Sequence, residues 1–600
     1  IFLKINSFRL TVQKNSSQRA QSRSDVAPAE RYASSSVLHS GTWYKIRVAE
    51  SGVFRLTRQF LSKIGFNDPS RVRLYGYGGA VLPETGLENL IDDLPEVPLW
   101  RSGDNILFYA QGPLSWQRSG DGSFVHSWNT YSKYGYYFLT ADEKTAPAVM
   151  EEMPVSEGNA MVVESYNDYA LYENDAFSWI ESGRTFYDSY DFATGPTKTY
   201  KFNLEGSVND MAMVSLSVST DGSSVSFLET YFDDNLIGVL QIPVKSGNDV
   251  ASVRSGSYIY SGPVGNDATV KLHFNQAQGM SSRLDYIRIN YLRSLALRGS
   301  FSNFRSNAVG NPVIFKIATD RNAVVWNING NNPRIVPSSL SGGYCVTSPV
   351  DGSSDDEYVV LDPDASFPEP EAVGRIDNQD LHSLSSADMV IIIPADGRLR
   401  THAERLAEAH RQTDGISSVV VGADMIYNEF SSGTPDATAY RRFMKMLYDR
   451  AEPGGGPRYL LLFGGGLWDN RMVTSSWAGM SQDNCLLCYE SENSVSTTAS
   501  YVSDDYFGLL EDGKGYRLTS EKVDIGIGRI PVLNADDAEA VVNKTIAYLR
   551  GENAGEWQNT FVILGDDGDD NMHMSQADEL AATISCGTEY LVKSVCPVDT

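Results

Sequence analysis

The hydrophobic and polar positions follow two patterns, and the change between them falls near residue 387. Before it, from Trp43 to about residue 298, apolar and polar residues alternate in short runs separated by Gly, Asn, Asp and Ser. This alternation is typical of strands buried on one face. From Met389 onward, short apolar runs alternate with segments of helical period, which indicates βαβ units. We expect a multidomain fold: N-terminal all-β and α+β modules including a β-sandwich, then an α/β domain with a mainly parallel sheet.

The same patterns predict individual elements. The first module has strands at 43–48, 53–57, 72–75, 106–109 and 136–139 and a helix at 58–64. The sandwich has strands at 199–204, 211–218, 225–232, 239–244, 257–260, 269–274 and 284–291. The α/β domain has strands at 389–393, 416–421, 459–463, 523–528, 560–564 and 590–595, with helices at 398–413, 436–450, 536–550 and 572–584.

Composition shifts predict where the domains divide, because 600 residues are too many for one core. The expected order is a polar, disordered leader at 1–38, a β-rich module at 39–155, a β-sandwich at 156–299, a β-rich segment and linker at 300–386, and the α/β domain at 387–600. The linker is the Pro-rich run Phe367–Glu371.

Charge and cysteine content exclude several functions. The net charge is −27, which argues against nucleic acid as a partner because phosphate binding needs a basic face. No apolar run is long enough to cross a bilayer, so we expect any membrane contact to be indirect. Five cysteines in this length are too few for a disulfide scaffold.

Glycines and acids gather where strands of the α/β domain end. Tyr459–Phe463 is apolar on both faces and is followed by Gly464-Gly465-Gly466. Two carboxylates, Asp504 and Asp505, lie in a turn beside aromatic residues. In open α/β sheets, ligands bind outside the carboxyl ends of the strands. This stretch is therefore the predicted site.

Three motifs in this order, YLLLFGGGLWDNR, SDDYFG and VDIGIGRIPV, resemble the gingipain-type, caspase-like cysteine peptidases. WYKIRVAESGVFRLT and IYNEFSSGTPDATAYRRFMKMLYDRA extend the likeness from about residue 38 to the end, toward the sortase-like members that serve the type IX secretion system. The resemblance implies a caspase-like α/β domain and a Cys-His pair. The relatives usually carry an acid where Gly465 stands, which weakens any role for that loop.

The expected catalytic pair cannot be assigned within the chain. The family places its histidine in a Gly-His-Gly turn, and no His-Gly pair occurs here. His573 lies in the segment that precedes the family's histidine, and all seven histidines are expected to be structural or surface residues. We expect the nucleophile and base beyond residue 600, which makes the α/β domain incomplete and this fragment inactive.

Asp524 is the candidate catalytic residue by resemblance, since the family has an acid at this strand position. It would orient the imidazole of the catalytic histidine. The alternative is a strand-end aspartate that accepts hydrogen bonds from backbone amides. Asp524 has apolar neighbours, and a buried carboxylate is costly without a partner. In either role, hydrogen bonds or an opposite charge must therefore compensate the buried charge.

Two further groups suit metals or redox chemistry. Asp566, Asp567 and Asp569 lie in a loop whose oxygens suit structural Ca²⁺, and gingipains bind calcium; acidic capping of the next helix is the alternative. Cys485 and Cys488 have CxxC spacing without a second ligand pair, so a loop disulfide or two buried thiols is favoured over zinc. No cofactor is expected to be required.

By resemblance, the whole protein is expected to be an exported cysteine endopeptidase attached peripherally at the outer-membrane surface. It would remove C-terminal sorting domains from exported proteins and transfer these proteins to an anionic lipopolysaccharide, with other secretion-system and attachment-complex proteins as partners. The alternative is a non-enzymatic surface scaffold or adhesin with a caspase-like domain. A metal-dependent phosphoesterase using Asp504, Asp505 and the acids at 566–570 ranks last, because no histidine cluster supports it.

Overall fold

The computed structural model describes residues 27–103, 105–141, 145–306, 311–353, 356–452, 455–555, 557, 560–566, 568–583 and 589–594. The chain divides into two units. The first comprises residues 1–397 and 419–533, and the second comprises 398–418 and 534–600. Each unit is described by itself.

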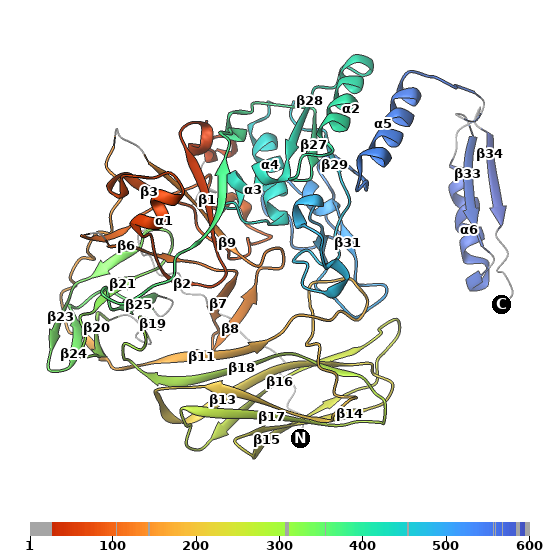
Figure 1. The fold of residues 1–600 in the computed structure, drawn as a ribbon. Coiled ribbons are helices and arrows are strands. Elements are labelled where there is room, and N and C mark those ends of the chain that lie inside the picture. Colours follow the sequence, from red (N-terminus) through yellow and green to blue (C-terminus); the bar gives the residue numbers. More distant parts are fainter. Residues whose placement is uncertain are drawn as a thin grey trace. The chain divides into compact units, whose positions relative to one another are not determined.

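The first module is built on a five-stranded antiparallel sheet whose order is β26-β1-β9-β3-β4 (Figure 1). Its strands are β1 (Trp43–Val48), β3 (Val72–Tyr75), β4 (Glu96–Val97), β9 (Gly135–Ala141) and β26 (Glu371–Ile376). A second sheet has the order β2-β6-β5, with β2 (Gly52–Arg55), β5 (Trp100–Ser102) and β6 (Asn105–Ala110). Helix α1 (Arg58–Lys63) begins at Thr57, whose hydroxyl accepts a hydrogen bond from the Phe60 amide.

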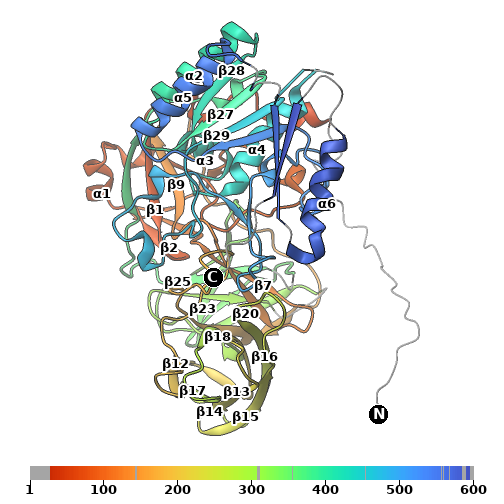
Figure 2. The ribbon, with the colours of Figure 1, turned by 90° about the vertical axis from the view of Figure 1, so that its right-hand side faces the viewer.

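The β-sandwich is confirmed as two four-stranded sheets, which Figures 1 and 2 show stacked on each other. One sheet has the order β11-β18-β13-β16 and the other β12-β17-β14-β15. Their bounds are β11 (Ser165–Glu173), β12 (Thr197–Asn203), β13 (Ser207–Thr220), β14 (Ser226–Phe232), β15 (Asn235–Ile242), β16 (Ser252–Ser261), β17 (Asp267–Asn275) and β18 (Ser282–Ser294). Alternate apolar residues of β13 and β17 fill the space between the sheets.

A hairpin of the first module, β7 (Leu114–Arg118) with β8 (Phe124–Trp128), packs on the outer face of the sandwich. The Asn290 side chain accepts from the Phe124 amide and donates to its carbonyl, as a neighbouring strand would. Trp116 stacks on Tyr169 with ring centroids 3.4 Å apart. These contacts tie the hairpin to β11 and β18.

The next segment forms two further sheets, ordered β10-β20-β24-β23 and β19-β25-β21-β22. Their strands are β10 (Met161–Val163), β19 (Phe301–Arg305), β20 (Val313–Ala318), β21 (Val324–Asn327), β22 (Arg334–Val336), β23 (Ser338–Ser341), β24 (Tyr344–Thr347) and β25 (Glu357–Leu361). The predicted linker is not a free connection. Phe367 is buried, the Pro368 carbonyl accepts from the Arg55 amide, and β26 returns to pair with β1.

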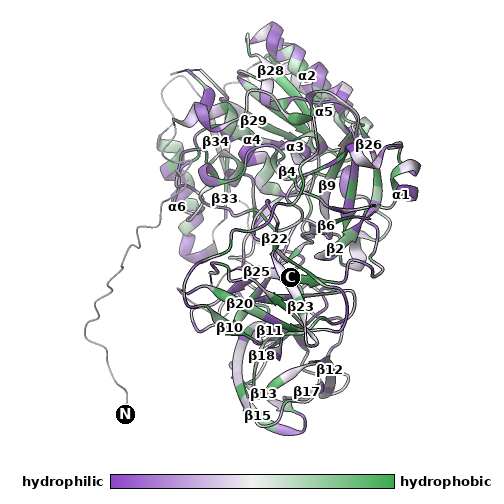
Figure 3. Ribbon diagram, turned by 90° about the vertical axis from the view of Figure 1, so that its left-hand side faces the viewer, coloured by the Kyte–Doolittle hydropathy of each residue, from purple (hydrophilic) through white to green (hydrophobic). Residues whose placement is uncertain are grey.

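The α/β part of the first unit has the predicted parallel sheet, and its strand order is β28-β27-β29-β32. The strands are β27 (Met389–Ile393), β28 (Ser418–Gly422), β29 (Tyr459–Phe463) and β32 (Gly526–Ile530), and β29 runs parallel to both β27 and β32. Every residue of β27 is buried, which explains its unbroken apolar run. The apolar composition of β29 is visible in Figure 3.

Helices α3 (Ala423–Phe430) and α4 (Ala437–Arg450) pack against this sheet, followed by the short pair β30 (Tyr489–Glu490) and β31 (Val502–Ser503) (Figures 1 and 2). Most cationic side chains of α4 are buried, and they donate hydrogen bonds to backbone carbonyls of the neighbouring loops. The Arg441 guanidinium donates to the carbonyls of Leu509 (2.6 Å), Glu84 (2.7 Å) and Lys514 (2.9 Å). Lys445 donates to the Leu510 carbonyl at 2.8 Å. The helix thereby fixes the loops that surround the sheet.

The expected disordered leader is wrong for residues 27–38, and its first 26 residues lie outside those described. Residues Pro28–Arg31 and Val37–His39 form 3₁₀ turns. Arg31 makes a bidentate ion pair with Asp512, both distances being 2.8 Å. Polarity alone misled the prediction, because the segment is held both by ion pairs and by a few buried apolar side chains, Leu38 among them.

The second unit contains α2 (Arg400–Thr413), α5 (Ala535–Leu549), α6 (Gly568–Ala582) and the parallel pair β33 (Thr560–Gly565) and β34 (Glu589–Ser594). Helices α2 and α5 lie side by side, and α6 packs on β33 and β34. No helix in the described part of the chain is long and apolar enough to span a membrane.

Candidate active-site edge of the parallel sheet

The carboxyl ends of β27, β29 and β32 meet at one edge of the parallel sheet, and the glycine turn lies there. The amide of Gly464 donates to the Ile530 carbonyl, and the amide of Gly465 donates to that of Val532, both at 3.0 Å. The Gly465 carbonyl accepts from the Leu486 amide at 2.9 Å. The turn therefore extends the ladder beyond the strands and binds the following segment.

The three glycines are required by close packing. A Cβ at Gly464 would overlap Pro394, one at Gly465 would overlap Leu533, and one at Gly466 would overlap the Cys488 sulfur. The relatives usually carry an acid at the position of Gly465. In this chain the space beside Gly465 is filled by the apolar side chain of Leu533. The turn is a packed support rather than a phosphate loop.

The edge also carries an ion pair, formed by Arg529 and Asp504. The Nε and Nη2 of Arg529 donate to the two carboxylate oxygens of Asp504 at 2.9 and 2.7 Å. Its remaining N–H groups approach the carbonyls of Gly464 and Leu487 at 3.4 Å. This bidentate pair is largely buried, so it fixes the 503–508 turn against the glycine turn. Asp504 is therefore a structural partner of Arg529.

The CxxC residues are two buried thiols, as favoured by their spacing. Cys485 and Cys488 are about 3% and 5% exposed and form no disulfide. Burial raises the pKa of the Cys488 thiol, and the nearby Arg529 guanidinium opposes the rise only in part. A nucleophilic cysteine needs the opposite shift. These thiols suit packing better than catalysis.

Two buried acids that the sequence reasoning missed lie just beyond the glycine turn. Asp469 is fully buried and accepts from the amide and hydroxyl of Thr474, each at 2.8 Å. Burial raises the pKa of Glu490 to about 9. The Arg184 guanidinium donates to the Glu490 carbonyl at 2.6 Å. The signal in the sequence was WDNR, an acid between apolar and basic residues after a strand.

Asp524 lies at the opposite end of β32 from this edge. The strand begins at Gly526 rather than at residue 523, so Asp524 precedes it. Its Oδ2 accepts from the amides of Leu510 (2.7 Å) and Glu511 (3.1 Å), and its Oδ1 binds the Lys514 ammonium. These contacts are those of the capping alternative. The catalytic role of Asp524 stays a prediction.

The predicted calcium ligands are only partly described, because Asp567 lies outside the described residues. Asp566 and Asp569 are exposed, and the Asp569 carboxylate lies 3.2 Å from Nε2 of His573. Residues 569–571 have left-handed backbone, so the right-handed part of α6 begins after them, where the helix at 572–584 is predicted to begin. Among the described residues, no three His, Cys, Asp or Glu side chains could hold a metal. The two described acids, Asp566 and Asp569, do not by themselves form a cage, and calcium stays a prediction.

The histidines contact groups other than cysteines. His382 lies between Glu429 and Asp92, and His126 lies between Glu173 and Arg288. The other described contacts are His39 to Ser36, His273 to Thr197, His410 to Asp414 and His573 to Asp569. These contacts support the structural role expected for them.

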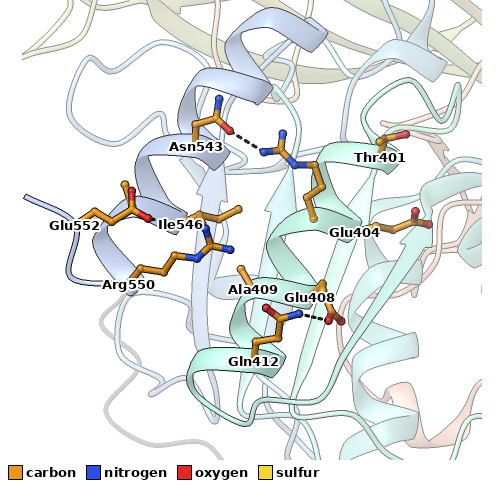
Figure 4. A pocket seen from close by; sticks show the side chains of 11 residues that line it. Thr401, Glu404, Glu408, Ala409, Gln412, Asn543, Ile546, Arg550 and Glu552 are labelled. Atoms are coloured by element: carbon orange, nitrogen blue, oxygen red, sulfur yellow. Dashed lines mark hydrogen bonds and ion pairs between the residues drawn. The ribbon is translucent and has the colours of Figure 1, made fainter.

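In the second unit, a groove of about 690 Å³ separates α2 from α5 (Figure 4). Arg405 crosses it and donates to the Asn543 side chain at 2.7 Å. Glu404, Glu408, Arg550 and Glu552 also line it. Its lining contains neither cysteine nor histidine, so it does not provide the chemistry expected at the sheet edge.

The parallel sheet, with its turns gathered at the carboxyl edge, defines the class: a caspase-like α/β domain behind β modules, as predicted. Residues 382–595 match the model of Peptidase family C25, the gingipain family. The structure is similar to that of dimeric latent PorU from Porphyromonas gingivalis, with a TM-score of 0.79 and 32% identity over 88% of this chain. The chain spans about half (51%) of that PorU chain.

Other comparisons add no argument. The CBM36-1 domain of a multidomain xylanase from the hindgut metagenome of Trinervitermes trinervoides has 8% identity over 20% of this chain and 96% of its own, with a TM-score of 0.15. Such a score carries no inference about fold or function. No curated protein matches the sequence.

Proposed function

We propose that the whole protein is a sortase-like cysteine endopeptidase of the type IX secretion system. It removes C-terminal sorting domains from exported proteins and transfers these proteins to an anionic surface lipopolysaccharide. The observation that carries the proposal is the likeness to PorU over 88% of this chain, together with the match to Peptidase family C25. Both the β modules and the α/β domain share in that likeness.

The reaction has two balanced steps. A thiolate attacks the carbonyl carbon before the sorting domain, the peptide C–N bond breaks, and a histidine protonates the leaving amine. An amine of the lipopolysaccharide then attacks the thioester, the C–S bond breaks, and the proton of the amine passes to the base. Within this chain, the packed glycine turn and the Arg529–Asp504 pair support a rigid sheet edge for such chemistry.

The β modules supply the docking surface in this proposal. The hairpin β7–β8 packs on the sandwich. The segment after β29, which belongs to the α/β part, also contacts the sandwich: Arg471 forms an ion pair with Asp175, and the Val250 amide donates to the Val495 carbonyl at 2.7 Å. We place the protein at the cell surface, attached peripherally through other outer-membrane proteins of the secretion system. The net charge of −27 is consistent with partners other than nucleic acid.

The test is deletion of the gene in its own bacterium, followed by mass analysis of a cargo protein that carries a sorting domain. The proposal expects uncleaved cargo without lipopolysaccharide, and restoration of both features by the wild-type gene. Cleaved cargo without lipopolysaccharide in the deletion strain would show that another enzyme does the cleavage, which removes the peptidase role and leaves the transfer. Unchanged cargo in the deletion strain would overturn the proposal.

A non-enzymatic scaffold is the second candidate, favoured by the buried, raised-pKa thiol of Cys488 and by histidines bound elsewhere. The two candidates separate in the deletion strain. The scaffold is supported if a variant that no thiol-directed inhibitor labels still restores cargo processing, and the enzyme is supported if such a variant fails.

A further inference from the structure

A pocket of about 360 Å³ lies between the first module and the segment of β19–β25, away from the parallel sheet. Strands β6 and β25 belong to different sheets, and their apolar residues share one core. The loop between β21 and β22, residues 328–333, closes one side of the pocket. The pocket is thus formed by two modules and has a fixed frame.

Aromatic side chains form much of the wall: Tyr77, Tyr109, Trp116 and Tyr137. One face of Trp116 is covered by Tyr169, so the rest of its ring is what lines the pocket. Aromatic rings in a pocket offer flat apolar surface to a ligand that has C–H groups on one side. The size of the pocket suits one or two small rings.

The three phenols are set up as hydrogen-bond donors. Their oxygens accept from the Asn303 side chain (Tyr109, 3.0 Å), the Gln111 amide (Tyr137, 2.9 Å) and the Arg442 guanidinium (Tyr77, 3.1 Å). Among the described residues, none accepts the hydrogen of any of these hydroxyls. Burial raises the pKa of all three phenols, so each keeps its hydrogen at neutral pH.

The remaining polar groups are amides, the Ser115 hydroxyl, which donates to the Ser127 carbonyl, and one neutralised acid. Asn331 lines the pocket, and its side-chain amide bonds to none of the described residues. Glu357 is paired with Arg305 at 2.7 Å. No lysine or arginine lines the pocket, so a phosphate or another anion would find no counter-charge. The pocket therefore offers hydroxyl donors, side-chain amides and aromatic rings, and it has no net charge. These groups suit a ligand with an uncharged ring that carries several hydroxyl groups.

We propose that this inter-module pocket binds a neutral saccharide, with ring C–H groups on the aromatic wall and hydroxyl oxygens accepting from the phenols. The sugar belongs either to the glycan of a lipopolysaccharide or to a free oligosaccharide. This binding does not depend on peptidase activity. It goes beyond the proposed function by giving the β modules a ligand of their own.

The experiment screens the purified chain, with Trp fluorescence and saturation-transfer NMR, against a panel of neutral di- and trisaccharides built from glucose, galactose, mannose and N-acetylglucosamine. A delipidated lipopolysaccharide glycan is the second arm. Binding of the glycan but of no free sugar assigns the ligand to lipopolysaccharide, and binding of free sugars assigns it to oligosaccharides. A flat response in both arms overturns the proposal.

Three variants locate the binding. Tyr109→Phe keeps the ring and removes one donor, and Asn331→Ala removes an amide from a partly exposed loop position. Each is expected to weaken binding about five- to tenfold, the worth of about one net hydrogen bond. Tyr516→Ala, at a side chain 73% exposed on the α/β part, is the control and should bind as wild type. Undiminished binding by both pocket variants would place the sugar elsewhere and overturn the proposal.

Discussion

Removing His382 should destabilise the protein near neutral pH and have much less effect above pH 9. This imidazole is fully buried, with Nδ1 2.6 Å from a Glu429 oxygen and Nε2 3.1 Å from Asp92. Glu429 also accepts from the amides of Leu381 and His382. The network joins the segment before β27, helix α3 and the first module. The proposed variant is His382→Gln.

The magnitude follows from the pKa of the imidazole. Burial opposes the charge, but hydrogen bonds and attraction from Asp92 and Glu429 outweigh it and raise the pKa of His382 from 6.5 to about 9. Such a rise corresponds to about 3 kcal/mol of stabilisation. Because the folded pKa lies above the unfolded one, this stabilisation is fully present below pH 6.5 and is lost as the pH rises through about 9. At pH 6 the variant also leaves two buried carboxylates without a cation, so we expect a loss of about 3–5 kcal/mol.

The assay compares thermal unfolding of the wild type and the variant from pH 6 to pH 10, with hydrogen exchange over residues 380–384 and 426–431 to follow local opening. The variant must be compared with the wild type at each pH because other groups titrate in the same range. Burial moves the pKa values of Glu173 and Lys45 to about 8. His410→Gln, which breaks an exposed His–Asp pair on α2, is the matched control. A difference that stays constant across this pH range, or an equal effect of the control, would refute the reasoning.

Three further outcomes are expected. Asp524→Asn in the whole protein should lower the thermal midpoint by the equivalent of about 1–3 kcal/mol, because Lys514 loses one of its two carboxylate partners and keeps only Glu511. Single-turnover acylation per folded molecule should hold; slower acylation with an unchanged midpoint would restore the catalytic role. Thiol-directed peptidase inhibitors should not label Cys485 or Cys488 in the folded fragment, and mass analysis showing selective labelling of either would contradict the structural role. Limited proteolysis with a glutamate-specific protease should spare residues 367–376, since β26 is paired with β1; early cuts there, seen by mass analysis, would contradict the pairing.

Most elements could be predicted from the sequence because their hydrophobic period is regular. Seven of the eight strands of the sandwich, and the β27 and β29 pair, occur where alternation or apolar runs predict them, whereas β11 (Ser165–Glu173) was not predicted. Helix α3 and the hairpin β7–β8 were missed, since both are short and gain their stability from tertiary contacts. Pairing between distant segments, as between β1 and β26, leaves no local pattern that could be recognised.

The edge of the sheet at which the candidate site lies could be predicted from the sequence, but the side chains that meet there could not. Three glycines after β29 point to close packing, and the structure shows the side chains that require it. The buried acids Asp469 and Glu490 were missed because the burial of an acid depends on segments far along the chain; the Arg184 guanidinium, for example, bonds to the backbone carbonyl of Glu490 rather than to its carboxyl group. An isolated motif does not contain that information.

Asp504 and Asp524 show how strand direction decides which acid can act at the edge. Both stand near an apolar strand in the sequence, and a strand at 523–528 would have included Asp524. The observed strand, Gly526–Ile530, begins after Asp524 and ends beside Arg529, which holds Asp504. Asp524 would be the second residue of the predicted strand and lies before the observed one, so it is at the amino end in both cases, whereas Arg529 holds Asp504 near the carboxyl end. Arg529 and Asp504 therefore support this edge, while the catalytic role of Asp524 stays a prediction.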